Sequence, residues 1–290
     1  MSATSPFTTT VPGRPISDDS APAVWRIALG RTANALFAFV LTAAVLIGLW
    51  YLFLKVADVG SYVGKTPTDV WDYLMDQTRG AERRSEIWSA TGETMWQAGL
   101  GYLIGTALAV AVSVVFVLSK AVERAVMPIA LALRSIPIVA MIPLLAYLFG
   151  RDLLGSMIVV AIIVWFPTLV FMTFGLRSLS KEQFDLLKAL HASKWQYFLK
   201  ARVPAALPAF FAAAKVTAPA AILGALINGW LTTGDGLGNL MLLSTTSSKY
   251  ARLWAAVVIV TLLSMLLVAF VTALESAVLA KYAPDRLAER

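Results

Sequence analysis

The stretch LWAAVVIVTLLSMLLVAFVTAL, residues Leu253–Leu274, contains no charged side chain. An α-helix needs about 20 consecutive apolar residues to cross the hydrocarbon core of a membrane. The stretch meets this requirement, so it predicts a membrane-spanning helix close to the C-terminal end of the chain.

Further apolar runs precede this stretch at Ala33–Leu54, Gln97–Leu118, Ala125–Gly150, Leu153–Leu176 and Pro204–Leu231. Two of the runs contain one cation each, Arg134 in the third and Lys215 in the fifth. Together the runs predict an all-α polytopic membrane protein with about six transmembrane helices. Within the second run, Gly101 and Gly105 have the small-xxx-small spacing that allows close packing against a neighbouring helix.

The composition also indicates a membrane protein. Of the 290 residues, 59% are hydrophobic and 14% are charged, whereas soluble domains carry about 25% charged residues. The net charge of +7 would suggest nucleic acid binding in a soluble chain. Here the cations lie mainly between the apolar runs, so we expect membrane topology to be their cause and no nucleic acid partner.

The chain offers little for catalysis. It has no cysteine and one histidine, His191, and no His/Asp/Glu cluster has the spacing of a metal site. A phosphate loop requires glycine five positions before Gly64, where Val59 stands. We therefore expect no catalytic residue, no metal and no nucleotide cofactor on this chain.

The distribution of lysine and arginine predicts the orientation of the chain in the membrane. If both termini are cytoplasmic, 14 of these residues lie in inner segments and 8 in outer segments, as the positive-inside rule favours. The expected organisation is a cytoplasmic and largely disordered tail at residues 1–32, a transmembrane domain at 33–280 and a cytoplasmic tail at 281–290. A membrane-surface helix starting at Thr66-Pro67, which could dock an outside partner, is expected within the outer connection 56–96.

The inner segment 178–203 predicts two short amphipathic helices. A Ser-x-x-Gln capping box begins the first at Ser180. Residues 191–193 interrupt the pattern, and Trp195 and Phe198 supply the apolar side of the second helix. The residues alone leave two interpretations open, a helix pair lying in the headgroup region or an element that docks a partner.

Several short motifs follow one another along the chain: Arg134-Ser135-Ile136-Pro137 with Ile142-Pro143-Leu144, Phe166-Pro167, Leu190-His191-Ala192-Ser193, Val203-Pro204-Ala205-Ala206-Leu207-Pro208 and Gly236-Leu237-Gly238. In this order and spacing they resemble the permeases of binding-protein-dependent ABC importers. The similarity is to the branch that imports nitrate, taurine, aliphatic sulfonates and thiamine-pyrimidine precursors. It covers roughly residues 60–280.

This resemblance implies a type I ABC importer permease fold in a bacterial inner membrane. It also implies separate cytoplasmic ATPase subunits, which would bind ATP and Mg, and an extracytoplasmic substrate-binding protein. The permease would pair with a second copy or with a different permease. Segment 178–203 would then be the ATPase-coupling loop, and the transported solute would be nitrate, a sulfonate, taurine or a pyrimidine-type compound.

The residues that the resemblance places in the coupling loop are Asp185, Lys188, Leu190, His191, Ala192, Ser193, Lys194, Trp195, Phe198 and Pro204. Among them, Trp195 and Phe198 are the expected apolar anchors in the ATPase groove. Lys188 and Lys194 are the expected charges at the rim of that groove.

Polar residues within the spans are the candidates for the translocation pathway, because ionisable groups inside a membrane are costly and often functional. We expect Lys215 to extend to the headgroups, and Arg134 to reach the inner interface or to cap a helix break at Pro137. Either cation would suit an anionic substrate if it faced the pathway. Thr217 and Asn228 complete the set.

The chain departs from the family pattern at two positions. His191 stands where the branch has glycine between the coupling helices, and Gly229 stands where it often has glutamate. Both departures suggest a diverged member, and one hypothesis is that it pairs with a second, different permease. The rival interpretation is a secondary transporter or a membrane scaffold without an ATPase partner, although no internal repeat is evident.

Overall fold

The computed structural model describes residues 41–179 and 193–282, and this part of the chain is helical without β-strands. The described residues form two compact units, one ending at Thr66 and the other beginning at Pro67. In the first unit, a helix runs over Leu41–Val56, the described part of the expected first span. Residues 1–40 and 283–290, which contain the expected terminal tails, lie outside the described residues.

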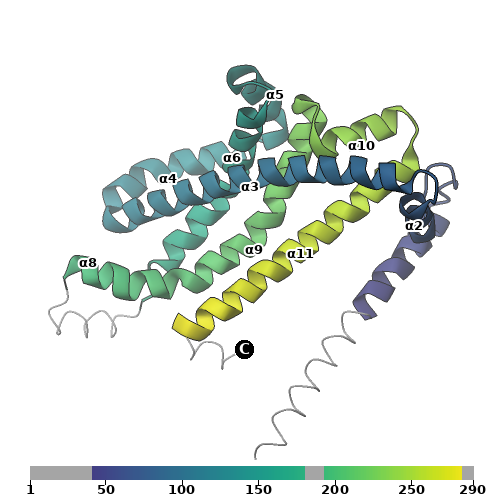
Figure 1. Ribbon diagram of the computed structural model, residues 1–290. Helices are drawn as coiled ribbons and strands as arrows, with labels where there is room; N and C mark the ends of the chain where they lie inside the picture. The colour runs from purple at the N-terminus through teal and green to yellow at the C-terminus, as the bar shows by residue number, and fades with distance from the viewer. Residues whose placement is uncertain (1–40, 180–192, 283–290) are drawn as a thin grey trace, which may run out of the picture. The chain divides into compact units, whose positions relative to one another are not determined.

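The second unit contains the elements that carry the candidate site (Figure 1). In chain order they are α2 (Pro67–Met75), α3 (Gly80–Leu118), α4 (Lys120–Ser135), α5 (Ile138–Phe149), α6 (Leu153–Gly175), α8 (Lys194–Tyr197), the π-helical turn η1 (Phe198–Arg202), α9 (Val203–Asn228), the π-helical turn η2 (Gly229–Thr233), α10 (Gly236–Thr246) and α11 (Tyr250–Tyr282).

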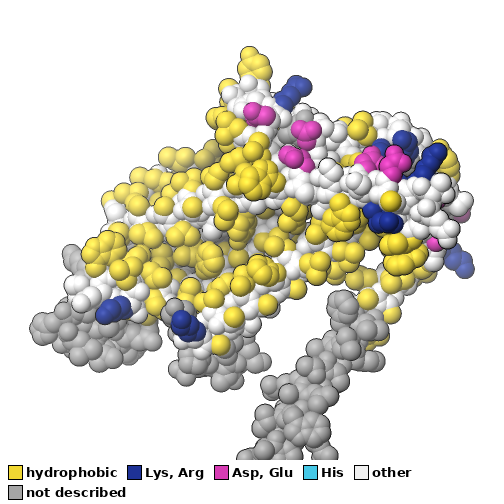
Figure 2. Space-filling view, viewed as in Figure 1, with side chains coloured by type: hydrophobic (Ala, Val, Ile, Leu, Met, Phe, Trp, Pro, Cys, Tyr) yellow, Lys and Arg dark blue, Asp and Glu magenta, His cyan; other side chains and the backbone are white. Residues whose placement is uncertain are grey.

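Four helical segments in the described residues are long and apolar enough to cross a membrane. They are α3, α6, the continuous helix Trp195–Thr232 and α11. The pair α4 and α5 adds a fifth if it is counted as one broken span. These segments confirm the polytopic all-α class, and Figure 2 shows hydrophobic side chains covering much of their surface.

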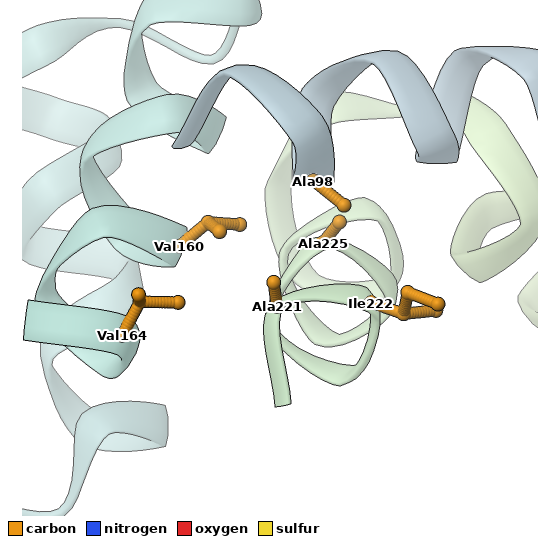
Figure 3. Packing of buried hydrophobic residues seen from close by; sticks show 6 residues of the cluster. All are labelled: Ala98, Val160, Val164, Ala221, Ile222 and Ala225. Atoms are coloured by element: carbon orange, nitrogen blue, oxygen red, sulfur yellow. The ribbon is translucent and has the colours of Figure 1, made fainter. Parts of the chain in front are cut away.

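Helices α3, α6 and α9 form the centre of the unit. Their buried side chains meet in a cluster of small and β-branched residues, drawn in Figure 3: Ala98, Val160, Val164, Ala221, Ile222 and Ala225. A methyl group at Gly105 would lie 2.7 Å from the carbonyl oxygen and 2.9 Å from Cα of Ala161. The close packing predicted for Gly101 and Gly105 is therefore confirmed, and the neighbour is α6.

The prediction of an outer connection over residues 56–96 is only partly correct. Helix α2 begins at Pro67 as predicted, and it packs against α3 and α11 with Val70 buried. Helix α3, however, already begins at Gly80, so residues 80–96 extend the second span rather than link it. A charged stretch can continue a helix beyond the hydrocarbon core, which hydropathy alone does not detect.

The third apolar run, 125–150, is not one straight span. Helices α4 and α5 meet at about Pro137 with a bend of 100°. The ring of Pro137 restricts the preceding residue to extended backbone, and Ile136 has φ −78° and ψ 124°. The break expected at this proline is confirmed, while the single span across it is corrected.

The second coupling helix is not separate from the fifth span. From Lys194 to Thr233 the backbone is continuously helical through α8, η1, α9 and η2. Pro204 lacks an N–H and its ring crowds the carbonyl one turn earlier. The turn before it is widened, with the N–H of Val203 donating to the carbonyl of Phe198, and this π-turn accommodates the proline without ending the helix.

Substituting Gly105 by alanine tests the α3–α6 contact. We expect Gly105→Ala to lower the melting temperature of the detergent-solubilised protein, because overpacking against Ala161 costs about 1–3 kcal/mol. Gly99→Ala is the matched control, since nothing lies within 4 Å of a methyl group at Gly99 in the same helix. Equal melting temperatures for the two variants, followed by circular dichroism, would contradict the close contact.

Candidate coupling and translocation site

The two ends of segment 178–203 lie close together and are linked by a hydrogen bond. The hydroxyl of Ser178 donates to the carbonyl oxygens of Gly175, at 2.8 Å, and of Ala205, at 3.3 Å. A methyl group at Gly175 would lie 2.5 Å from Cβ of Ala209, so the end of α6 and the start of α9 are in close contact. The segment therefore leaves and rejoins the helices at the same place.

An ion pair fixes the position where the segment leaves α6. The two terminal nitrogens of Arg177 donate to the two carboxylate oxygens of Glu123 at 2.8 and 2.6 Å. One of them also donates to the carbonyl of Phe116 at 3.2 Å. The Glu123 carboxylate raises the pKa of Arg177 above its ordinary value, and the bidentate geometry links α6 to the α3–α4 turn.

A reciprocal capping box starts the helix α8 within the second half of the segment. The N–H of Ser193 donates to Oε1 of Gln196 at 2.9 Å, and the N–H of Gln196 donates to the Ser193 hydroxyl at 3.2 Å. This is the Ser-x-x-Gln pattern of a helix N-terminus. Ser193 is therefore the N-cap of α8, a role that was not predicted for it, while residues 191 and 192 of the expected interruption lie outside the described residues.

Half of the predicted coupling residues lie outside the described residues. These are Asp185, Lys188, Leu190, His191 and Ala192, together with the capping box expected at Ser180. Ser193 is the N-terminal cap, Lys194 begins α8 and Pro204 lies in the first turn of α9. The roles of all these residues in coupling stay predictions.

Trp195 and Phe198 differ in their environment. Trp195 is 65% exposed, whereas Phe198 is only 7% exposed. Phe198 packs with Met172, Leu176 and Ala206, and its ring meets that of Trp195 edge to face at 5.8 Å between centroids. The expectation that Phe198 is an anchor for an ATPase is therefore corrected, because its ring belongs to the core of this chain; Trp195 alone remains available.

Lys215 is partly buried and forms an ion pair with a neighbouring helix. Its Nζ lies 2.7 Å from a carboxylate oxygen of Glu275 on α11, and Glu275 is 2% exposed. A buried charge is stable only when it is paired, so the contact with Lys215 stabilises the buried carboxylate of Glu275. The ion pair does not test the expected extension of Lys215 to the headgroups, which stays a prediction. The partner Glu275, the first residue after the expected sixth span, was not among the predicted residues.

Arg134 lies at the helix break, in the last turn of α4. Its guanidinium carbon is 4.8 Å from the centroid of the Phe166 ring on α6, within the range of a cation–π interaction. Pro137 is the N-cap of α5. Both residues are exposed in the chain, so Arg134 remains accessible to a ligand or a partner.

Thr217 and Asn228 are buried within the packing of α9. The Thr217 hydroxyl donates to the carbonyl of Ala213 in its own helix at 2.9 Å. The Asn228 side-chain oxygen accepts from Thr232 at 2.9 Å, while Nδ2 of Asn228 has no hydrogen-bond partner among the described residues. No hydrogen bond, ion pair or ring contact among the described residues joins any two of the five predicted pathway residues.

The Gly-Leu-Gly motif at residues 236–238 allows α10 to pack closely against α3 and α9. Gly236 has φ +74°, which favours glycine, and the N–H of Leu237 donates to Thr94 on α3 at 2.8 Å. A methyl group at Gly238 would clash with the carbonyl of Leu226. The two glycines of the motif are therefore required by the backbone conformation and by close helix packing, which a single sequence does not reveal.

Three further polar contacts join helices of this unit. The Ser156 hydroxyl donates to the side-chain oxygen of Gln97 at 2.8 Å in a buried contact between α6 and α3. Arg252 donates to Glu86 at 2.6 Å and to Ser244 at 2.7 Å. Arg252 is buried, so it joins α11 to α3 and α10.

The sequence of the second unit identifies the family to which the chain belongs. A family model described as "Binding-protein-dependent transport system inner membrane component" matches residues 101–280, which is more than half of the chain. The chain belongs to this family, and it is a permease subunit of an ABC importer rather than a secondary transporter or a scaffold.

Curated relatives extend the match. The chain is 26% identical over 227 residues to a probable ABC transporter permease protein of Haemophilus influenzae, covering 78% of this chain and 90% of the relative. It is 29% identical over 180 residues to the formylaminopyrimidine transport permease protein of Halalkalibacterium halodurans, covering 62% and 72%. A putative aliphatic sulfonates transport permease protein of Bacillus subtilis matches at 24% identity over 246 residues, covering 85% and 88%.

Among solved structures, the chain is similar to an inward-facing conformation of the MetNI methionine ABC transporter. The TM-score is 0.58 at 19% sequence identity, and the match covers 70% of this chain and 99% of the other. This similarity confirms the type I importer permease fold that the sequence motifs predicted.

A double-mutant cycle tests the ion pair between Lys215 and Glu275. We expect Lys215→Met and Glu275→Gln each to destabilise the protein and the double variant to recover part of the loss, with a coupling energy of about 1–3 kcal/mol. Thermal unfolding in detergent would measure this. Lys200→Met is the control, since Lys200 is exposed and forms no ion pair among the described residues; strictly additive effects would show that the pair contributes nothing.

Proposed function

We propose that this chain lines the translocation pathway and receives the force of ATP hydrolysis through segment 178–203. The observation that carries the proposal is the continuous helix from Lys194 to Thr233. It joins the end of the coupling segment directly to the fifth span. A displacement applied at α8 therefore reaches the membrane-spanning part of α9 without passing through a flexible connection.

The base of the segment supports this role. Ser178 holds the α6 end against Ala205, and Phe198 fixes α8 to the core of the chain. With both ends held, a push on the exposed ring of Trp195 is transmitted to helices rather than absorbed by the segment. A short helix seated in the groove of a partner is a common way to transmit such motion.

The partners follow from the same proposal. Separate cytoplasmic ATPase subunits bind ATP and Mg and carry out hydrolysis, a second permease completes the pathway, and an extracytoplasmic binding protein delivers the solute. We propose that this segment and both termini are cytoplasmic, and the six cations of Arg177–Arg202 support this orientation under the positive-inside rule.

The substrate is proposed to be a small solute of the kinds named for the relatives, such as a formylaminopyrimidine or an aliphatic sulfonate. Because Glu275 neutralises Lys215, Lys215 is a poor candidate for attracting an anion. Arg134, exposed at the helix break and stacked on Phe166, is the cation of the pathway set that remains available for a negatively charged or aromatic solute.

A pull-down from membranes tests the ATPase contact. We expect the wild-type chain, solubilised in mild detergent, to retain an ATPase subunit identified by mass spectrometry, and Trp195→Ala to reduce the retained amount about tenfold or more, as loss of an aromatic anchor does. Trp71→Ala is the matched control, because Trp71 is also exposed, at 63%, but lies on α2 rather than near the coupling segment.

The outcomes separate the parts of the proposal. If no ATPase accompanies the wild-type chain, the proposed partner is wrong. If Trp195→Ala retains as much ATPase as Trp71→Ala, the anchor is wrong while the partner stands. A second permease species in the wild-type sample would support the mixed pairing suggested by His191 and Gly229, and a single species would contradict it.

A further inference from the structure

One side of α4 changes from cationic to apolar along its length. Lys120, Arg124, Met127 and Leu131 are spaced by four, three and four residues, so they lie on one face of the helix. The two cations occupy the first turns, and the two apolar side chains follow toward the C-terminal end. The face is therefore cationic at its N-terminal end and apolar at its C-terminal end, a pattern that matches the charged head and apolar tail of an amphiphile.

This face forms the wall of an open groove. The groove has a volume of about 530 Å³ and is lined by Lys120, Glu123, Arg124, Met127, Pro128, Leu131 and Arg177. Both oxygens of the Glu123 carboxylate accept from Arg177, which neutralises that carboxylate. Lys120 and Arg124 form no ion pair with any described residue, so within the described part of the chain the groove presents two positive charges that no carboxylate pairs with.

The position of the groove relative to the membrane follows from the neighbouring helices. The membrane-spanning α3 ends at Leu118, and Ser119 caps the start of α4. Lys120 thus lies at the end of a span, at the level of the headgroups, and Leu131 lies about 16 Å further along the α4 axis. Cations at this level attract anionic lipids, and the apolar residues beyond them suit an acyl chain.

We propose that this groove binds an anionic phospholipid. Its phosphate would lie between Lys120 and Arg124, and one acyl chain would run along Met127, Pro128 and Leu131. A free phosphate would satisfy only the cationic end, whereas the lipid matches the whole length of the face. Because Arg177 also lines the groove and directly precedes segment 178–203, the bound lipid contacts the base of the coupling loop. The proposal does not depend on the ATPase contact.

Competition between two lipids tests the site. The permease, purified in mild detergent with any subunits that accompany it, is mixed with equal amounts of phosphatidylglycerol and phosphatidylcholine of the same acyl chains, and bound lipids are counted by native mass spectrometry. We expect the wild-type chain to prefer phosphatidylglycerol. Lys120→Gln/Arg124→Gln should lower phosphatidylglycerol binding about fivefold for each cation removed, and leave phosphatidylcholine unchanged.

Two matched variants make the outcome specific. Lys120→Arg/Arg124→Lys keeps the charges and should keep the preference, whereas Lys200→Gln/Lys281→Gln removes two exposed cations outside the groove and should also keep it. The proposal is overturned if Lys120→Gln/Arg124→Gln retains the wild-type preference. It is also overturned if millimolar inorganic phosphate or glycerol phosphate displaces phosphatidylglycerol, since the site would then recognise the phosphoryl group alone.

Discussion

The close approach of α6 to α3 and α9 is the contact on which the rest of the molecule depends. Glycine makes this approach possible, because a Cβ at Gly105 would overlap the backbone at Ala161 and one at Gly175 would overlap Ala209. In a membrane, helices gain little from excluding water, so packing and interhelical polar contacts must hold them together. These contacts fix the positions of α6 and α9, and thereby the two ends of segment 178–203.

Ion pairs also connect elements that are distant in the sequence. Glu275 neutralises Lys215 between α9 and α11, and Glu123 holds Arg177 at the start of the coupling segment. In each case the pair joins two elements that are far apart in the sequence. Charges that would be costly alone therefore act as connections between helices, whereas Arg134 and the two cations of the α4 groove remain open to ligands.

The sequence was sufficient for the fold class because hydrophobic length is a local property. Uncharged runs such as Leu153–Leu176 must be helices in a membrane, since a helix satisfies its own backbone hydrogen bonds. The break at Pro137 was also predictable, because the proline ring acts on its immediate neighbour. Helix ends were less predictable from the sequence. Helix α3 begins at Gly80, within a charged stretch, and α8 continues into α9 through a stretch that contains proline. The hydropathy of such stretches does not indicate a helix.

The sequence by itself determined the apolar spans, the small-residue contact of Gly101 and Gly105, and the family motifs. Only the tertiary structure decided which polar side chains meet. It showed that Phe198 is a core residue while Trp195 is exposed, that Lys215 has Glu275 as its partner, and that Arg177 binds Glu123. The reason is physical: burial and ion pairing depend on the approach of residues 54 or 60 positions apart, which no local pattern encodes.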